Sequence, residues 1–169
     1  QSSPLASGWS SPEDLFVFKD RLFFTAQDYV NGRQLWTSDG TTAGTFVLKK
    51  ISPELSVSTY PNPYTSGDQF YFTTRDSLFR HHALWKSDGT ADGTLLVAGN
   101  DVVRSPTAFA ALGETLLFNG VSQGHGSELW RSDGTESGTT MIRDIFNGPN
   151  SLDFTEMVTI GPRVFYAAS

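Results

Sequence analysis

The sequence has 169 residues, of which 38% are hydrophobic and 18% charged, a balance typical of a folded globular domain and not of a disordered chain. The formal net charge of −6, without any run of basic residues, argues against nucleic acid as a partner, because phosphate binding needs clustered Lys and Arg. The chain has no cysteine, which excludes disulfides and thiolate metal sites, and no apolar stretch approaches the ~20 residues of a membrane helix, so we expect no membrane insertion.

Residues 1–11 precede the patterned part of the chain and are rich in Ser, Gly and Pro. No charged segment followed by an apolar one occurs there, so we expect a linker or a processed N-terminal segment and not a signal peptide. The aromatic share of 13% in the whole chain favours β-strands, since aromatic side chains pack well on a pleated surface.

A repeated motif organises the rest of the chain. The segment Leu-Trp-x-Ser-Asp-Gly-Thr begins at Leu35, Leu84 and Leu129, and each copy is followed after two residues by Gly-Thr. A hydrophobic triplet precedes each copy and occurs once more near the end of the chain, at residues 22–24, 70–72, 116–118 and 164–166. Self-similarity at this period indicates a repeat architecture.

Each unit has the pattern of four short strands separated by turns that contain Gly, Pro or Asp. In the first unit we expect strands near residues 15–18, at 22–24, in the Leu-Trp segment and at 46–49. No helical periodicity extends over twelve or more residues. The sequence therefore predicts an all-β fold with β-propeller-like blades of four antiparallel strands. Three full repeats span residues 12–60, 61–105 and 106–153, and residues 154–169 form the first half of a fourth.

The repeated segments resemble the bacterial ELWxxDGT repeat family, whose name spells Glu-Leu-Trp-x-x-Asp-Gly-Thr. The third unit matches this motif from Glu128 to Thr135, whereas Gln34 and Ala83 replace the glutamate in the first and second units. The resemblance implies propeller-like repeats in a large exported or surface protein. It supplies no catalytic residue to carry over.

The Asp-Gly step inside each motif is a strong signal for a tight turn, because Gly accepts positive φ and Asp bonds the backbone two residues on. We interpret the following residues as structural: Asp39, Gly40, Asp88, Gly89, Asp133 and Gly134. The alternative is calcium, for which carboxylate and hydroxyl oxygens are suitable donors. One carboxylate per loop is few for a cage of about six to eight oxygens, so we expect no cofactor and no metal site.

The tryptophans Trp36, Trp85 and Trp130 recur at one place in the unit, 49 and 45 positions apart. A Trp in an apolar strand favours a packing role, because it buries on the order of 200 Å². The alternative is a set of aromatic rings that stack on sugars, as in a repeat lectin.

The segments between the second and third strands differ most between units, and binding residues are often found in such variable segments. They lie at residues 27–33, 76–82 and 121–127. We take as candidate binding residues Tyr29, Arg33, Phe79, His81, His82 and His125. The histidines are expected in exposed loops, and the adjacent pair points to opposite sides of an extended chain, which disfavours a shared metal.

The sequence contains no Gly-x-Ser-x-Gly, His-Glu-x-x-His or phosphate-binding loop. Acidic pairs such as Glu13-Asp14 and Asp153/Glu156 resemble ordinary surface carboxylates. We therefore expect a non-catalytic binding or scaffold module of a secreted or cell-surface bacterial protein. The alternatives are a carbohydrate-binding propeller lectin and the propeller framework of an extracellular hydrolase.

The half repeat also predicts a partner. A propeller hides the flank of its last blade against the first, and rings typically have about 4–8 blades. We therefore expect this chain to associate with the remainder of a larger propeller or with further copies of itself. A glycan or protein ligand at the variable segments is the other expected partner.

Overall fold

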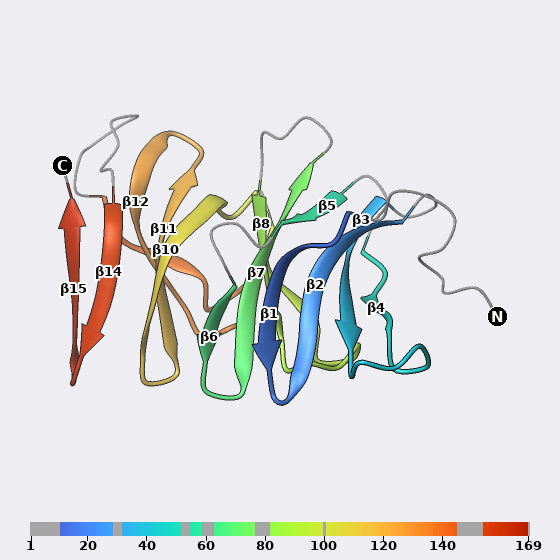
Figure 1. Ribbon diagram of the computed structural model, residues 1–169. Helices are drawn as coiled ribbons and strands as arrows, with labels where there is room; N and C mark the ends of the chain where they lie inside the picture. The colour runs from blue at the N-terminus through green and yellow to red at the C-terminus, as the bar shows by residue number, and fades with distance from the viewer. Residues whose placement is uncertain are drawn as a thin grey trace. The chain divides into compact units, whose positions relative to one another are not determined.

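The computed structural model describes residues 11–28, 32–51, 55–58, 63–76, 82–99, 101–144 and 154–168. All regular structure within these residues is β, which confirms the predicted all-β class (Figure 1). The described residues form no helix with the length and apolar character needed to cross a bilayer. They fall into two compact units, Gln1–Arg80 with Ser87–Leu95 and His81–Lys86 with Leu96–Ser169.

The first sheet lies in the first unit and has the strand order β1-β2-β3-β4. Its strands are β1 (Glu13–Phe18), β2 (Arg21–Asp28), β3 (Gly32–Ser38) and β4 (Phe46–Lys49). All neighbouring strands are antiparallel. Strands that are consecutive in sequence are therefore neighbours in the sheet, as expected for one repeat that folds on itself.

The second sheet has the order β5-β7-β8-β9, and β6 also pairs with β7. Its strands are β5 (Leu55–Ser58), β6 (Tyr64–Ser66), β7 (Gln69–Asp76), β8 (His82–Ser87) and β9 (Leu95–Ala98). Strand β5 lies within residues 12–60, the expected first repeat, yet it pairs with β7 from Leu55↔Asp76 to Ser58↔Thr73. Two separate segments thus pair with β7 where the other sheets use one strand.

The remaining strands belong to two further sheets. One has the order β10-β11-β12-β13, formed by β10 (Arg104–Leu112), β11 (Thr115–Ser122), β12 (His125–Ser132) and β13 (Thr140–Arg143). The other pairs β14 (Phe154–Ile160) with β15 (Arg163–Ala168). The predicted four-stranded antiparallel sheet is confirmed for the first and third repeats.

Aromatic side chains form the core of the first unit. The ring of Phe70, which is fully buried, lies 5.0 Å from Phe16, 5.1 Å from Phe18 and 5.2 Å from Phe23 between centroids. Gly89 lies on the same side, where an added Cβ would be 3.5 Å from the Phe23 ring and 3.7 Å from the Phe18 ring. Strand β7 and the corner after β8 therefore cover the β1–β2 hairpin.

Two of the recurring tryptophans are buried in their own sheets. Trp36 pairs with Phe24 across β2 and β3, and the two rings stack at 6.3 Å and 17°. Trp130 pairs with Phe118 across β11 and β12 in the same way, at 6.4 Å and 22°. Because only 4% of Trp36 and 5% of Trp130 is exposed, neither ring presents a face for stacking on a sugar. Trp85, in β8, is half-buried.

Candidate functional site

Each Ser-Asp-Gly-Thr segment forms a corner between a third and a fourth strand, and its own side chains hold it. In the first corner, Oδ1 of Asp39 accepts hydrogen bonds from Thr41 N at 2.9 Å and Thr41 Oγ1 at 2.7 Å. Ser38 Oγ accepts one from Gly40 N at 3.0 Å and lies 2.7 Å from Thr45 Oγ1. Thr45 Oγ1 donates to Thr41 O at 2.6 Å. The polar side chains of the motif are thus engaged within the corner.

The other two corners repeat these bonds. Asp88 Oδ1 accepts from Thr90 N at 2.8 Å and from Thr90 Oγ1 at 2.7 Å. Asp133 Oδ1 accepts from Thr135 N at 2.9 Å and from Thr135 Oγ1 at 2.6 Å. The glycine that follows each aspartate has φ of 90°, 94° and 86° in chain order. Such left-handed values favour glycine, because a Cβ would crowd the backbone.

Each corner has a second glycine that lies so close to the aspartate side chain that no other residue fits there. A Cβ added to Gly44, Gly93 or Gly138 would overlap the carboxylate of the aspartate in the same corner. The amide of this glycine donates to the corner threonine's Oγ1, at 2.9, 2.9 and 3.1 Å. The second Gly of the motif therefore leaves room for the aspartate to fold back over the corner.

The hydrogen bonds also set the charge state of the three aspartates. The hydroxyl of Thr41, Thr90 or Thr135 contributes most to lowering the pKa of Asp39, Asp88 and Asp133, and the amide of the same threonine adds to it. A nearby cation lowers the pKa further: Arg21 for Asp39, Lys19 for Asp88 and Lys86 for Asp133. Hydrogen bonds to a carboxylate favour its ionised form, so the corners hold three negative charges.

The corners offer few ligands for calcium. Calcium requires about six to eight oxygen ligands, and each corner contributes one carboxylate whose Oδ1 already accepts two hydrogen bonds. Across the described ranges, no group of three or more His, Asp or Glu side chains is placed to hold a metal ion. The side chains of the corner act as hydrogen-bonding groups that stabilise a turn.

A polar cluster surrounds Arg33, near the start of β3 and away from the corner that follows β3. Arg33 Nη2 donates to Glu13 Oε1 at 3.1 Å, and Arg33 Nη1 donates to Thr25 Oγ1 at 3.0 Å. Thr25 Oγ1 also lies 3.2 Å from Asp14 Oδ2. Asp14 has φ of 54° at the point where the β1–β2 register shifts. Glu13 thus contacts the guanidinium directly, and Thr25 links Asp14 to it.

A second pair lies at the start of β12. His125 Nδ1 is 2.9 Å from Asp144 Oδ2, and the exposed fractions of the two side chains are 39% and 22%. The other oxygen, Oδ1 of Asp144, is buried and makes no hydrogen bond within the described part of the chain. The pair joins the first residue of β12 to the residue that follows β13.

The candidate binding residues are placed as follows. His82 and His125 are the first residues of β8 and β12, and not loop residues as expected. For His125 the reason is the tight turn at 123–124 that joins β11 to β12. Arg33 lies in the first unit, and both histidines lie in the second. Tyr29, Phe79 and His81 lie outside the described residues. Thr25, which contacts Arg33, and Asp144, which contacts His125, were not expected from the sequence.

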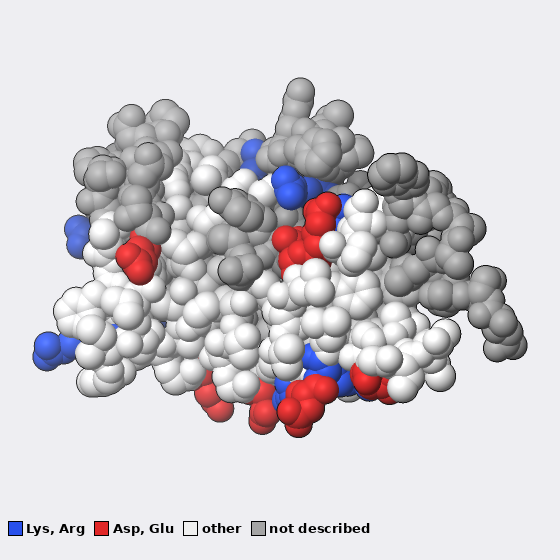
Figure 2. Space-filling model, in the orientation of Figure 1, with Lys and Arg blue, Asp and Glu red and all other residues white. Residues whose placement is uncertain are grey.

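Charge on the surface is mixed. On the face shown in Figure 2, acidic and basic side chains occur together, and uncharged residues make up most of the area. Lys19 pairs with Asp68 at 3.4 Å, and Arg33 pairs with Glu13 at 3.1 Å. The first pair joins two hairpin turns, and the second joins β1 to β3.

No protein-family model matches the chain. No curated protein matches it either. Among solved structures, an alpha-L-arabinofuranosidase from Clostridium thermocellum ATCC 27405 is similar over 95% of this chain and 60% of that one, with 13% identity and a TM-score of 0.42. A protein assigned as an exo-beta-1,3-galactanase from Bifidobacterium bifidum s17 is similar over 82% of this chain and 54% of that one, with 13% identity and a TM-score of 0.40. The chain thus spans less than two thirds of either protein's length.

Proposed function

We propose that this chain is a non-catalytic binding or scaffold module of propeller type, in a secreted or cell-surface protein. The observation that supports this function is the use made of the recurring residues. The Ser, Asp and Thr side chains bond within all three corners, and Trp36 and Trp130 are buried. The recurring residues therefore stabilise the fold, and ligand binding is assigned to residues that differ between repeats.

The contact between successive repeats in the first unit supports the propeller architecture. Phe70 and Gly89 of the second repeat lie on Phe16, Phe18 and Phe23 of the first. Propeller blades of four antiparallel strands are likewise arranged in succession around an axis. The ELWxxDGT resemblance supports the same assignment. In this proposal the chain provides three blades and the first half of a fourth.

The candidate binding positions lie where the second strand of each repeat leads into the third. Arg33 marks this place in the first unit, and His82 and His125 mark it in the second. Tyr29, Phe79 and His81 adjoin these residues in sequence. The Arg33 cluster combines one guanidinium with the carboxylates of Glu13 and Asp14. Such a set both donates and accepts hydrogen bonds, which suits a peptide or a glycan hydroxyl and not a phosphate backbone. A protein ligand is our first choice, because the buried Trp rings are unsuited to stacking on sugars.

Binding and hydrolysis assays test this function. The chain is applied to a glycan array and to an array of extracellular bacterial proteins, with Arg33→Ala as the site variant and Arg131→Ala as the matched control. We expect binding to one class of protein that Arg33→Ala weakens about tenfold and Arg131→Ala leaves unchanged. Hydrolysis of glycosides that Asp14→Asn abolishes would overturn the non-catalytic assignment. Glycan binding that depends on Arg33 would identify a lectin instead.

A further inference from the structure

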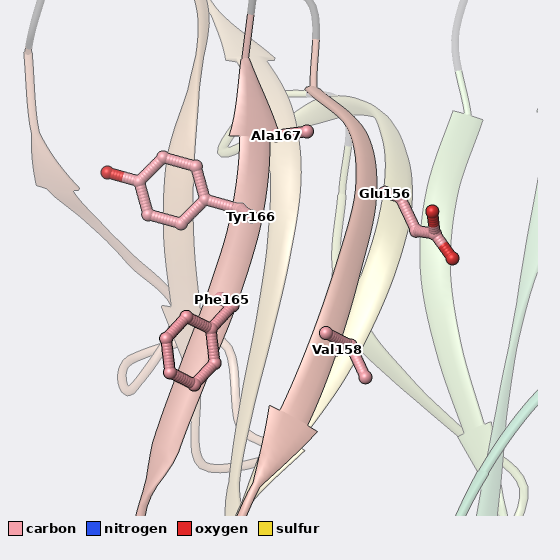
Figure 3. A pocket seen from close by; sticks show the side chains of 5 residues that line it. All are labelled: Glu156, Val158, Phe165, Tyr166 and Ala167. Atoms are coloured by element: carbon pink, nitrogen blue, oxygen red, sulfur yellow. The ribbon is translucent and has the colours of Figure 1, made fainter.

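Three aromatic side chains of the described residues are exposed, and they lie in two different settings. Phe165 (49%) and Tyr166 (47%) lie on β15, where they line a surface hollow together with Val158 (Figure 3). That hairpin is a sheet of two strands. Phe46 (46%) lies instead at the start of β4, in the four-stranded sheet of the first repeat. Its surroundings are polar and charged.

Arg21 connects the ring of Phe46 to the first corner. Its Cζ lies over the ring, 5.8 Å from the centroid, which is within the range of a cation–π contact. Its Nε donates to Thr37 Oγ1 at 3.1 Å, and its Nη2 donates to Gly44 O at 2.9 Å. Thr37 is also the residue that pairs with Phe46 across β3 and β4. The guanidinium is therefore held in place beside the ring.

The carboxylate of Asp39 lies on the other side of this guanidinium. Its Oδ1 accepts the two hydrogen bonds from Thr41 that close the corner. Its Oδ2 accepts none from the described residues and lies 3.9 Å from Arg21 Nη1. The exposed fractions of the two side chains are 42% for Asp39 and 34% for Arg21. A ligand that approaches from solvent thus meets one acceptor, Oδ2, and one donor, Nη1.

The other repeats show that the corner closes without the ring and without the guanidinium. In the second repeat Leu95 stands in the place of Phe46 and Gln69 in the place of Arg21, and the third repeat has threonine at both positions. The threonine hydroxyl nevertheless bonds the aspartate in all three corners. Of the three repeats that have a corner, only the first combines an exposed aromatic ring with a guanidinium. Turn closure does not account for this combination.

We propose that Phe46, Arg21 and Asp39 form a binding site for a neutral saccharide. One face of a pyranose is rich in C–H groups and stacks on the exposed side of the Phe46 ring. The hydroxyls at the rim of the sugar accept from Arg21 Nη1 and donate to Asp39 Oδ2. The positive and negative charges of the site compensate each other, so an uncharged sugar fits it better than a uronate does.

This saccharide site goes beyond the function proposed for the Arg33 position. Arg33 is near the start of β3, whereas Thr37, which holds Arg21, is near its end. The four residues between them correspond to about 13 Å along an extended strand. Sugar binding at Phe46 and protein binding at Arg33 are measured with different probes, so the two proposals fail separately.

Saturation-transfer NMR of the intact chain with glucose, galactose, mannose and glucuronate tests the site. The site variants Phe46→Leu and Arg21→Gln introduce the residues that the second repeat has at these positions. Phe165→Leu is the control, because it removes another exposed ring, and circular dichroism verifies that the fold is kept. We expect transfer to the C–H protons of at least one neutral sugar. Each site variant should weaken this binding about tenfold, and the control should leave it unchanged.

The carboxylate is tested by a matched pair of variants. Asp39→Asn and Asp88→Asn make the same change in two corners, but only Asp39 lies beside Arg21 and an aromatic ring. Asp39→Asn should weaken sugar binding, because a hydroxyl bonds a charged acceptor more strongly, and Asp88→Asn should not. The proposal is overturned if no neutral sugar receives saturation, if Phe46→Leu binds as the wild type does, or if glucuronate binds more tightly than the neutral sugars. Equal weakening by the two Asn variants would remove Asp39 from the site.

Discussion

At each corner a single threonine donates two hydrogen bonds to one aspartate oxygen, and this arrangement links the charge of the carboxylate to folding. The pKa of Asp88 is lowered from its ordinary value of 3.8, so the folded chain favours the ionised form. The stabilisation is therefore fully present above that value and is lost as the pH falls through the lower pKa of the folded state.

We expect Asp88→Asn to lower the melting temperature near neutral pH and to make no difference in strong acid. Asn keeps an oxygen that accepts from Thr90 but lacks the charge, so its bonds to the corner are weaker. Thermal unfolding between about pH 7 and pH 2 measures the effect. Asp92→Asn, in the same corner, is the matched control and should keep the profile of the wild type. If the melting temperature of Asp88→Asn were below that of the wild type by the same amount at every pH, the link to ionisation would be contradicted.

The second glycine of the corner depends on the aspartate that folds over it. Gly138→Ala should destabilise the chain by about 1–3 kcal/mol, because the new methyl group overlaps the Asp133 carboxylate. In an Asp133→Ala background the same change should cost about 1 kcal/mol less, since the overlapping group is gone. Urea unfolding of the two single variants and the double variant measures this coupling. Strictly additive costs would show that the two residues do not interfere.

At the scale of the element, the two buried tryptophans occupy equivalent positions but differ in one hydrogen bond. Trp130 Nε1 donates to Gly120 O at 3.0 Å. Trp36 Nε1 is buried and makes no hydrogen bond to any described residue. Both rings stack on a phenylalanine of the neighbouring strand. Comparing substitutions of the two tryptophans therefore separates the free energy lost with a buried hydrogen bond from the free energy lost with ring area.

We expect Trp130→Phe to destabilise the chain by about 1 kcal/mol more than Trp36→Phe does. Both changes remove the same ring area, but only the first leaves a buried carbonyl, that of Gly120, without its donor. Equilibrium denaturation of each variant against the wild type gives the two values. Equal losses would mean that water or a rearranged backbone replaces the bond.

The strands follow from the sequence wherever their pairing is local. The expected fourth strand at 46–49 coincides with β4, because the corner sets where it begins. Strand β5 was not expected, since Leu-Ser-Val-Ser is a short pattern and its partner β7 lies farther along the chain. The register of such a pair is decided by tertiary packing and not by local sequence. The connection at 121–127 was expected as a loop but forms a hairpin. The glycine at position 124 was the available sequence signal, and its φ in the structure is 84°.

At the scale of the whole molecule, the candidate site was predicted less completely than the sheets. Hydrogen bonds inside a corner join residues two to seven positions apart, so they can be predicted from the residue types of the motif. The pairs Arg33–Glu13 and His125–Asp144 join residues 20 and 19 positions apart, which only the folded strands bring together. The variable segments in the sequence indicated Arg33 and His125 as candidates, but they did not indicate the carboxylates that pair with them.

Metal dependence is also a property of the whole chain. We expect the same melting temperature in the presence of calcium and in the presence of a chelator, because each corner is closed by hydrogen bonds of its own. Differential scanning calorimetry with each additive measures this. A calcium-induced rise in melting temperature that Asp133→Asn removes would show that the corner binds the ion.

The crowding of glycine and aspartate in the corner also governs how such repeats can diverge over generations. A lineage that first loses the aspartate leaves space beside the glycine, which is then free to change. A lineage that changes the glycine first passes through a destabilised protein, which selection removes. The order of substitutions is therefore constrained, and a repeat that keeps its aspartate is expected to keep its second glycine. Repeats that have lost the motif should more often retain an orphaned glycine than an orphaned aspartate.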